Sequence, residues 1–562
     1  MSEKPMRDED GRPILPVALS RRGFLVRAGV VGLATMPLGA FLTACSQSTG
    51  ESGANGEMAK LRKGGTVTFA IDGTNGVLDP AVYTTLGDWM AVDCVCRGLT
   101  TIDFKTTTPA MAMAESSQIS DDGKTLTFTL RQGVTFHDGS VFTAQDCVRS
   151  FNRQLLDQDP SRPSNSTRPL RGSTNRSITE VRAVDERTFR ISLNQPDLTF
   201  LSRLTDISTR IISAAALDKY GANIGQNLVG AGPFKLVSAV PQQSVTLEAY
   251  DGYFGGRPLI DRLVLQQVTD PSSLNAGLQS GQITASSFVA HSSAKSLAAN
   301  PKVKVYDTPR RLAVFLLMNT TDPALSDIRV RQAVNLCVDR AQIAQNAFFG
   351  YANAPKGYIL PVGHVGYDES LADLTATDVA KAKQLITEAG ATGRAVELIA
   401  QNNNWYPKAA QILEENLKVI GLVPTVRLFD PGTFSGKVFD LKGHQIALWE
   451  RNGYVPDPED LVNNMLSSAG SYANRGTGHA ALDPDKVKQL DAMLVRGLQT
   501  ADPEQRKAAY TEAQRFFADN FMAISMVVHA QNIVAGSAEL GEINPEALSS
   551  QRMQMEKAGF AE

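Results

Sequence analysis

The chain alternates between helix patterns and strand patterns over much of its length, and this alternation restricts its fold more than any other feature. The stretch from Asp378 to Gly390 has helical spacing and ends on glycine, as many helices do. "RAVELIAQ" then has a strand pattern, and "AAQILEENLKVIGLVPTVRLF" repeats the order of helix, glycine and strand. This alternation predicts α/β lobes whose strands are joined mainly by crossover connections.

A hairpin followed by a capped helix is predicted in the first third of the chain. In "KTLTFTLRQGVTFHDG", apolar residues alternate with polar ones before a turn at residues 137–139. Thr143 is then the expected N-cap of a helix with Asp146 in its first turn. Farther along, Gly230 and Gly232 precede a predicted strand, so we attribute them to tight backbone packing and not to phosphate binding.

Residues 19–46, "LSRRGFLVRAGVVGLATMPLGAFLTACS", have the parts of an export signal. A basic lead is followed by an uncharged stretch from Ala28 to Ala44 that is rich in glycine and alanine and contains Pro37. A membrane-spanning helix needs about 20 strongly apolar residues, which this stretch lacks. We therefore interpret it as a cleaved signal, and the alternatives are a permanent span or a buried core segment.

Two short motifs make the export prediction more specific. Residues 20–25, "SRRGFL", resemble the twin-arginine signal, whose receptor exports already folded proteins. "LTAC" resembles the bacterial lipoprotein box, which implies that Cys45 is lipidated and becomes the mature N-terminus. The stretch from Ser46 to Lys60 is small and polar, which is typical of a flexible tether.

Charge and composition exclude several function classes. The chain has 55 basic and 58 acidic residues, and residues 45–562 retain 49 and 54, a net charge of −5. Nucleic-acid binding would require a clustered basic surface, which is not evident. The six histidines are scattered singly, and no cysteine pattern completes a zinc site. The sequence predicts no cofactor and no metal, and it leaves open whether Cys94, Cys96, Cys147 and Cys337 form one long-range disulfide.

Several blocks, in order, resemble the peptide/nickel class of bacterial extracellular solute-binding proteins, the family of dipeptide- and oligopeptide-binding lipoproteins that serve ABC importers. The most recognisable block is "AESSQISDDGKTLTFTLRQGVTFHDGSVFTAQDCVRSFNR". It is followed by "GAGPFKLVSAVPQQSVTLEAYDGYFGGRPLIDRLVL", "LNAGLQSGQI", "LMNTTDPALSDIRVRQAVNLCVDRAQI" and "PDPEDLVNNML". The resemblance covers roughly residues 62–540.

This resemblance implies an α/β, two-lobed periplasmic-binding-protein fold with a hinge and an additional inserted subdomain. The expected parts are a signal peptide at 1–44, a tether at 45–61, lobe I at 62–312 with a subdomain inserted at about 97–225, lobe II at 313–500, and a return to lobe I at 501–562. Closure of the hinge on a ligand would allow a transporter to recognise the occupied form by its shape.

The implied function is that of an extracytoplasmic, lipid-anchored, monomeric component of an ABC importer, in the periplasm or at the cell surface. Its partners would be an oligopeptide or modified peptide and the permease subunits. The alternatives are a non-peptide solute in the same fold (a nickel chelate, an oligosaccharide or an opine-like conjugate) and an extracytoplasmic peptidase. We find neither a GxSxG elbow nor an HExxH helix, so we do not expect an enzyme.

The resemblance also indicates where a ligand would be bound. Family ligands lie between the segment after the first strand, here "DGTNGVLDPAVYTT", and second-lobe segments that include "LWERNGYVPDPED". Hydrogen-bonding and aromatic side chains in such segments suit an extended peptide, although ordinary loop and core roles are the alternative for each. The candidate ligand-binding residues are Asn75, Tyr83, Thr84, Thr85, Asn404, Trp405, Trp449, Asn452 and Tyr454.

One position departs from the family pattern. Dipeptide-binding relatives have an aspartate three residues after the tryptophan of the "LWERNGY" segment, where the carboxylate meets the ammonium group of the peptide. This chain has Asn452 there, which removes a charge-assisted bond of about 1.5–3 kcal/mol. A free dipeptide is therefore disfavoured as the ligand. Glu450 could supply the missing carboxylate, whereas Arg451 would favour an anionic group.

Overall fold

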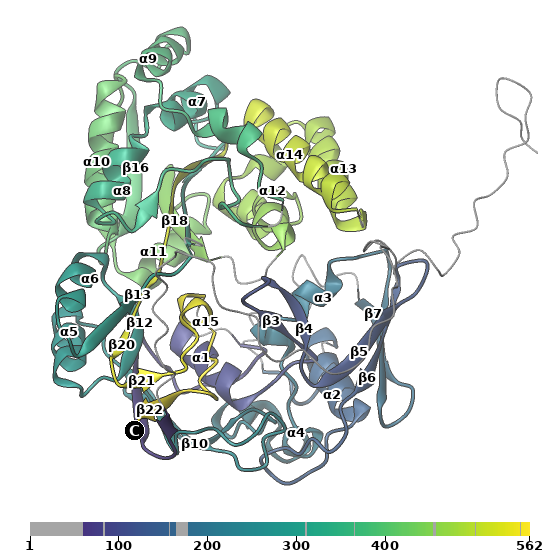
Figure 1. Cartoon of the computed structure of the whole chain (residues 1–562). Helices are drawn as coiled ribbons and strands as arrows, with labels where there is room; N and C mark the ends of the chain where they lie inside the picture. Colours follow the sequence, from purple (N-terminus) through teal and green to yellow (C-terminus); the bar gives the residue numbers. More distant parts are fainter. Residues whose placement is uncertain are drawn as a thin grey trace, which may run out of the picture. The chain divides into compact units, whose positions relative to one another are not determined.

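The computed structural model describes residues 60–82, 85–156, 158–163, 178–309, 312–364, 366–452, 457–500, 502–550 and 552–562 (Figure 1). The predicted signal peptide, Cys45 and nearly all of the predicted tether lie outside the described residues. The described chain is mixed α/β structure, with a seven-stranded, a six-stranded and a four-stranded sheet and two smaller ones. This agrees with the α/β class that the sequence predicts.

The seven-stranded sheet forms the core of the first lobe. Its strand order is β13 (Val303–Tyr306), β20 (Ile533–Ser537), β12 (Ala285–Val289), β2 (Thr66–Ile71), β11 (Arg262–Gln267), β10 (Ser244–Ala249) and β9 (Phe234–Val240). The central strand β2 pairs in parallel with both β11 and β12. A central strand of a covered sheet needs apolar side chains facing the core, and Val67, Phe69 and Ile71 of β2 are fully buried. The helices that pack near it are α1 (Leu86–Val95), α5 (Pro271–Ser280) and α6 (His291–Ala298).

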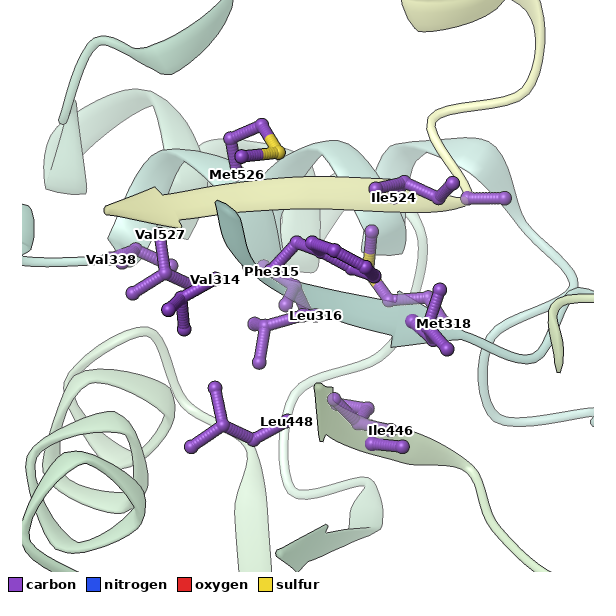
Figure 2. Packing of buried hydrophobic residues seen from close by; sticks show 14 of the residues in the cluster. Val314, Phe315, Leu316, Met318, Val338, Ile446, Leu448, Ile524, Met526 and Val527 are labelled. Carbon is purple, nitrogen blue, oxygen red and sulfur yellow. The ribbon is translucent and has the colours of Figure 1, made fainter. Parts of the chain in front are cut away.

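The six-stranded sheet forms the core of the second lobe. Its order is β15 (Ala352–Asn353), β19 (Ile524–Ala530), β14 (Leu312–Met318), β18 (Ile446–Asn452), β16 (Ala395–Gln401) and β17 (Val423–Phe429). Every residue of β14 and β19 is buried, and Figure 2 shows their side chains packing with those of β18. The helices of this lobe are α7 (Ile328–Cys337), α8 (Arg340–Asn346), α9 (Val379–Glu388), α10 (Tyr406–Val419), α11 (Pro431–Val438), α12 (Asn464–Leu466), α13 (Pro484–Gln499) and α14 (Pro503–Asn520).

The four-stranded sheet has its own hydrophobic core, packed against α2. Its order is β5 (Ala114–Ile119), β6 (Thr125–Leu130), β8 (Thr188–Leu193) and β7 (Ile178–Ala183), and α2 spans Ala144–Leu155. The backbone N–H of Thr143 donates to Asp146 Oδ2 at 2.8 Å, so the helix begins at the predicted cap. Phe151 of α2 is buried against Phe189 of β8, which also packs on Phe128 of β6. We propose that this sheet and its helix are the inserted subdomain.

Short elements complete the structure. The small sheets are β1 (Leu61–Arg62) with β22 (Gly559–Ala561) and β21 (Leu540–Gly541), and β3 (Thr100–Asp103) with β4 (Thr108–Met111). The remaining α-helices are α3 (Phe200–Arg203), α4 (Ala214–Tyr220) and α15 (Pro545–Ser549). Short stretches of 3₁₀- or π-helix are η1 (Ile207–Thr209), η2 (Gly221–Gln226), η3 (Glu369–Thr375), η4 (Glu459–Asn463), η5 (Tyr472–Gly476) and η6 (His479–Ala481).

The glycines before β9 are explained by backbone packing against α1, as the sequence indicates. A Cβ atom on Gly230 would lie 2.2 Å from the carbonyl oxygen of Val95, and one on Gly232 would lie 2.3 Å from that of Cys94. Both distances are far below van der Waals contact, so no larger residue fits at either position. This close approach fixes the C-terminal end of α1 against the start of β9.

The chain returns to the first sheet later than the sequence indicates. We expected the return at residue 501, but α14 packs on α13, and β19 pairs with β14 in the second sheet. The physical reason is that every residue of β19 is buried, and a fully buried strand needs neighbours on both sides, here β14 and β15. The return takes place after Ala530, where β20 begins.

Two crossings of the chain join the first sheet to the second. One leads from β13 toward β14 and contains Asp307 and Thr308, and the other leads from β19 to β20 through Gln531 and Asn532. Gln531 Nε2 donates to Asp307 Oδ1 at 2.7 Å and to the carbonyl oxygen of Thr308 at 2.8 Å. Thr308 Oγ1 donates to the carbonyl oxygen of Asn532 at 3.1 Å. The crossings are therefore bonded to each other, as in a hinge made of two adjacent segments.

Candidate functional site

In the first lobe, Asp88 organises the loop that follows β2. Its carboxylate accepts from Thr74 Oγ1 at 2.5 Å and from the backbone N–H of Asn75 at 3.0 Å. Thr85 caps α1 by accepting from the backbone N–H of Asp88 at 3.1 Å, and its hydroxyl donates to the carbonyl oxygen of Gly73 at 2.9 Å. Thr85 therefore has a structural role, while the side chain of Asn75 is exposed on an ordered loop.

Asp72, at the end of β2, is an acidic residue that our candidates did not include. Its side chain retains solvent access, yet the surrounding protein removes enough water to raise its pKa to about 6. The nearby negative charge of Asp88 contributes to the same shift in pKa. An acid directly after a central parallel strand is the signal that could have identified it, because ligands often bind at the carboxyl ends of such strands.

In the second lobe, a chain of aromatic rings connects two of the predicted residues. Trp405 stacks on Tyr406 with ring centroids 3.8 Å apart, and Tyr406 lies 5.9 Å from Phe434. Phe434 in turn lies 5.4 Å from Trp449, whose indole N–H donates to the hydroxyl of Tyr472 at 3.0 Å. Trp405 is 6% exposed and Trp449 is half-buried, so packing accounts for most of the surface of Trp405 and only part of that of Trp449.

Glu450 lies next to Trp449 in β18 and points to the other face of the sheet. Burial raises the pKa of its carboxyl group to about 7, and the adjacent indole N–H of Trp405 partly offsets this by favouring the ionised form. Glu450 retains partial solvent exposure and makes no ion pair with any residue that the structure describes. A carboxylate in this position can accept a cationic group from a ligand.

Asn452 connects the site to the hinge. Its side-chain oxygen accepts from Asn532 Nδ2 at 2.8 Å, and the same nitrogen donates to the carbonyl oxygen of Ser549 at 2.6 Å. Asn452 is only 6% exposed and ends β18 opposite Leu312 of β14. The position that departs from the family pattern is therefore bonded to one of the two crossings.

The other predicted residues are placed as follows. Asn404 is exposed, has a φ of 51°, and precedes Trp405 at the start of α10. Tyr83, Thr84 and Tyr454 lie outside the described residues. Asn75 and Thr85 are both hydrogen-bonded to Asp88, and Trp405 is connected to Trp449 through the rings of Tyr406 and Phe434. All of these residues remain predictions as ligand contacts.

The part of the chain that the structure describes has neither a cluster of metal-ligating side chains nor a helix that could span a membrane. No group of three or more His, Cys, Asp or Glu side chains within it is arranged to hold a metal ion. None of its helices combines the length and the apolarity that a membrane span needs.

Comparison with known proteins gives consistent matches. The model of the bacterial extracellular solute-binding proteins, family 5 Middle, matches residues 108–473. The glutathione-binding protein GsiB of Salmonella typhi is 30% identical over 409 residues, which cover 72% of this chain and 77% of that protein.

Solved structures share the fold at lower sequence identity. The ABC transporter-associated periplasmic binding protein DppA from Helicobacter pylori, in complex with the peptide STSA, is 22% identical with a TM-score of 0.78, covering 89% of this chain and 99% of that one. The binding protein AgaA from A. tumefaciens R10, in complex with agropinic acid, is 23% identical with a TM-score of 0.76, covering 88% and 99%.

Proposed function

Because the chain belongs to the bacterial extracellular solute-binding proteins of family 5, we propose that it captures an oligopeptide or modified peptide between its lobes and delivers it to the permease of an ABC importer. The observation that carries this proposal is the family match over residues 108–473, together with two lobes joined by a bonded pair of crossings. Members of this family are binding proteins and not enzymes, so the expected outcome of binding is an unchanged solute.

We assign the free amino group of the ligand to Glu450. This carboxylate lacks a cationic partner among the described residues and lies two residues before Asn452, where dipeptide-binding relatives have an aspartate. A half-buried carboxylate without a counter-ion costs free energy. A ligand ammonium group would remove that cost by supplying the opposite charge. A free amine can then be recognised although the family aspartate is absent.

A non-peptide solute is the second candidate. It is favoured by the neutral Asn452 and by the likeness to AgaA, which holds agropinic acid in its structure. The two candidates differ in whether the ligand has a free amino terminus, and this can be measured directly.

The test begins with native mass spectrometry of residues 46–562 purified from the host without denaturation. Denaturing release of a peptide, together with a rise in melting temperature when that peptide is added back, would support the proposal. An empty protein that no peptide library stabilises would favour the non-peptide solutes. Conversion of an added peptide into fragments would contradict the binding role altogether.

Peptide affinity should depend on pH through Glu450. A raised carboxyl pKa means that the empty site holds a proton up to about pH 7, so the empty protein loses stability as the pH rises from about 4.5 through 7. A ligand ammonium group requires the ionised form, so affinity should rise between pH 5.5 and pH 7.5. Isothermal titration calorimetry with one peptide across this range measures the effect. An equal rise for the N-acetylated peptide would contradict the assignment.

A contact between the segment that follows β8 and the second lobe should strengthen ligand binding. Arg203 Nη2 lies 3.5 Å from Glu459 Oε1, and the backbone N–H of Leu198 donates to the carbonyl oxygen of Leu498 at 3.2 Å. Glu459→Gln should lower peptide affinity on the order of fivefold, because this charged contact contributes about 1 kcal/mol to the form in which the lobes meet. Titration calorimetry measures the change, and Glu504→Gln on the exposed start of α14 is the matched control. Equal affinities for both variants would exclude a role for the contact.

We also propose that the protein is exported through the twin-arginine signal and anchored through a lipid on Cys45. The support is the resemblance of residues 20–25 and 42–45 to the two motifs. Replacing both Arg21 and Arg22 with lysine should block export, and Cys45→Ala should release the exported protein from the membrane fraction. Unaffected export of the lysine variant would remove the twin-arginine assignment, and continued membrane association of the alanine variant would remove the anchor.

A further inference from the structure

The first lobe contains a cavity of about 580 Å³ that the proposed function does not use. It is lined by the end of α1, the β3–β4 hairpin, residues 205–210, residues 253–254 and the C-terminal segment 542–557. None of the lining residues belongs to the second lobe, so the cavity does not require the lobes to meet. Its volume lies within the range typical of small-molecule sites.

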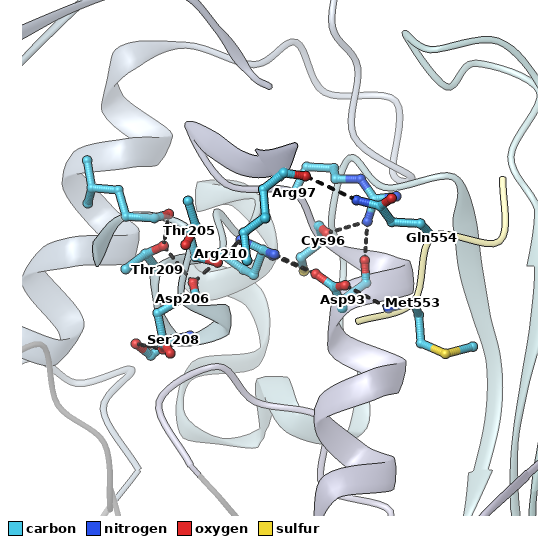
Figure 3. A network of polar contacts seen from close by, with 12 residues as sticks. Asp93, Cys96, Arg97, Thr205, Asp206, Ser208, Thr209, Arg210, Met553 and Gln554 are labelled. Carbon is cyan, nitrogen blue, oxygen red and sulfur yellow. Dashed lines mark hydrogen bonds and ion pairs between the residues drawn. The ribbon is translucent and has the colours of Figure 1, made fainter. Parts of the chain in front are cut away.

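The floor of the cavity is a network of charged residues around Asp93, shown in part in Figure 3. Arg210 Nη2 lies 2.5 Å from Asp93 Oδ1, and the backbone N–H of Met553 donates to Asp93 Oδ2 at 3.0 Å. Arg97 donates to the backbone carbonyl of Asp93 and lies 3.3 Å from Glu556 Oε2. The floor is therefore held rigidly by its own ion pairs, which orients two guanidinium groups at the base of the cavity.

Arg131 lies on the wall of the cavity and, unlike the two floor arginines, is not paired with an acidic side chain of the described residues. Its Nε donates to the carbonyl oxygen of Ala112 at 3.1 Å, and its guanidinium group lies 5.4 Å from the centroid of the Phe254 ring. It makes no ion pair with any of the described residues, and its side chain is only half-buried. The outer nitrogens of this guanidinium group are thus available to a ligand, while the ring of Phe254 fixes its orientation.

The charge of the whole lining also favours an anion. Six of the lining side chains are cationic and four are acidic, although the chain as a whole has a net charge of −3. A concave, positively charged surface on a negatively charged protein concentrates small anions locally. Apolar side chains, among them Ile102, Phe104 and Phe254, would contact the uncharged part of an organic molecule.

From these observations we infer that the cavity binds a small organic carboxylate, with Arg131 as the residue that receives it. A planar guanidinium group pairs with a carboxylate through two parallel hydrogen bonds, which an unpaired and oriented arginine can offer. The floor arginines, Arg97 and Arg210, contribute positive potential but keep their own acidic partners. The site lies within one lobe and uses none of the residues that we assign to the peptide amino group; only the possibility that the captured solute supplies the carboxylate rests on the proposed function.

The carboxylate can come from the captured solute or from a separate organic acid. The first source is suggested by α15, because Pro545 and Glu546 at its start line the cavity. The carbonyl oxygen of Ser549 at its other end accepts from Asn532, which also donates to Asn452. A single short helix therefore separates the cavity from the residues that we assign to the peptide site.

The test uses titration calorimetry on residues 46–562 with two pairs of probes. Succinate is compared with dimethyl succinate in the absence of peptide, and a peptide with a free carboxyl terminus is compared with its amide. Binding of succinate but not of its ester would identify a separate organic acid as the ligand. Binding of the free peptide at least tenfold more tightly than its amide would identify the end of the captured solute. Either result supports the carboxylate site.

The variants locate the effect. Arg131→Gln should lower the affinity for the carboxylate probe about tenfold or more, because a charge-assisted bidentate pair is lost. Arg182→Gln, an exposed arginine in the same four-stranded subdomain, is the control and should leave affinity unchanged. Lys557→Gln at the exposed rim should give a smaller loss and keeps the test usable if Arg131→Gln fails to fold. The inference is overturned if neither probe pair shows a difference, or if Arg131→Gln and Arg182→Gln have equal effects.

Discussion

Glu450→Gln should weaken binding of a peptide with a free amino terminus by about 1.5–3 kcal/mol, or roughly 10- to 150-fold. The variant keeps the size of the side chain and removes the negative charge that we assign to the ligand ammonium group. Binding of the N-acetylated peptide should change little, because that peptide has no charge to lose. Titration calorimetry on both peptides with both proteins completes a double-mutant cycle and isolates the charge interaction.

The neighbouring chain offers controls for this prediction. Glu415→Gln on the exposed face of α10 makes the same chemical change away from the site and should leave both affinities unchanged. Asn452→Asp should strengthen binding of a free dipeptide, because an aspartate oxygen can still accept from Asn532 while adding the charge that dipeptide-binding relatives have. If Glu450→Gln weakens the acetylated peptide as much as the free one, the residue supports the site structurally and does not bind the amine.

Arg153→Met should produce the largest loss of stability, about 3–5 kcal/mol in the free energy of unfolding. Arg153 is fully buried and forms two hydrogen bonds to Asp79, at 2.7 and 2.9 Å, and two to the carbonyl oxygen of Ser161, at 2.7 and 3.3 Å. Removing the arginine leaves the Asp79 carboxylate, 1% exposed, without its counter-ion. Thermal unfolding followed by circular dichroism, supported by urea titration, measures the loss.

Two further variants separate charge burial from loss of packing. Asp79→Leu combined with Arg153→Met should recover much of the stability, because no unpaired charge remains. Arg496→Met removes an ion pair with Glu512 whose side chains are both about half exposed, at 52% and 54%, and should cost at most about 1 kcal/mol. Equal destabilisation by Arg153→Met and Arg496→Met would show that burial of the Asp79 pair does not determine its contribution.

Local signals predicted the elements of the fold well but not their assignment to lobes. The cap at Thr143 and the glycine at 390 mark helix ends through local backbone geometry and hydrogen bonds within a few residues, so they are visible in the sequence. The strand β19 is a short, fully buried segment, and its pairing with β14 depends on residues about 200 positions away. Nothing local distinguishes a strand of one sheet from a strand of the other, which explains the error at residue 501.

The candidate site was predictable only where the family resemblance pointed to a segment. The resemblance named Trp449 and Asn452 as candidates, and both remain predictions. The surroundings of Glu450 were not foreseen, because neighbouring strand residues face opposite sides of a sheet. The cavity in the first lobe joins α1 to a segment more than 440 residues later in the chain. Its arginines have no shared sequence pattern, so only the folded structure brings them together.

The state of the cysteines has a consequence for the order of folding and export. Cys94, Cys96, Cys147 and Cys337 are buried free thiols in the structure, and burial raises the pKa of each of them. A fold held by packing and by buried ion pairs, with these four thiols unoxidised, can form in a reducing compartment before any membrane is crossed. Such a chain can complete its folding before export, as a translocation route that accepts only folded proteins requires.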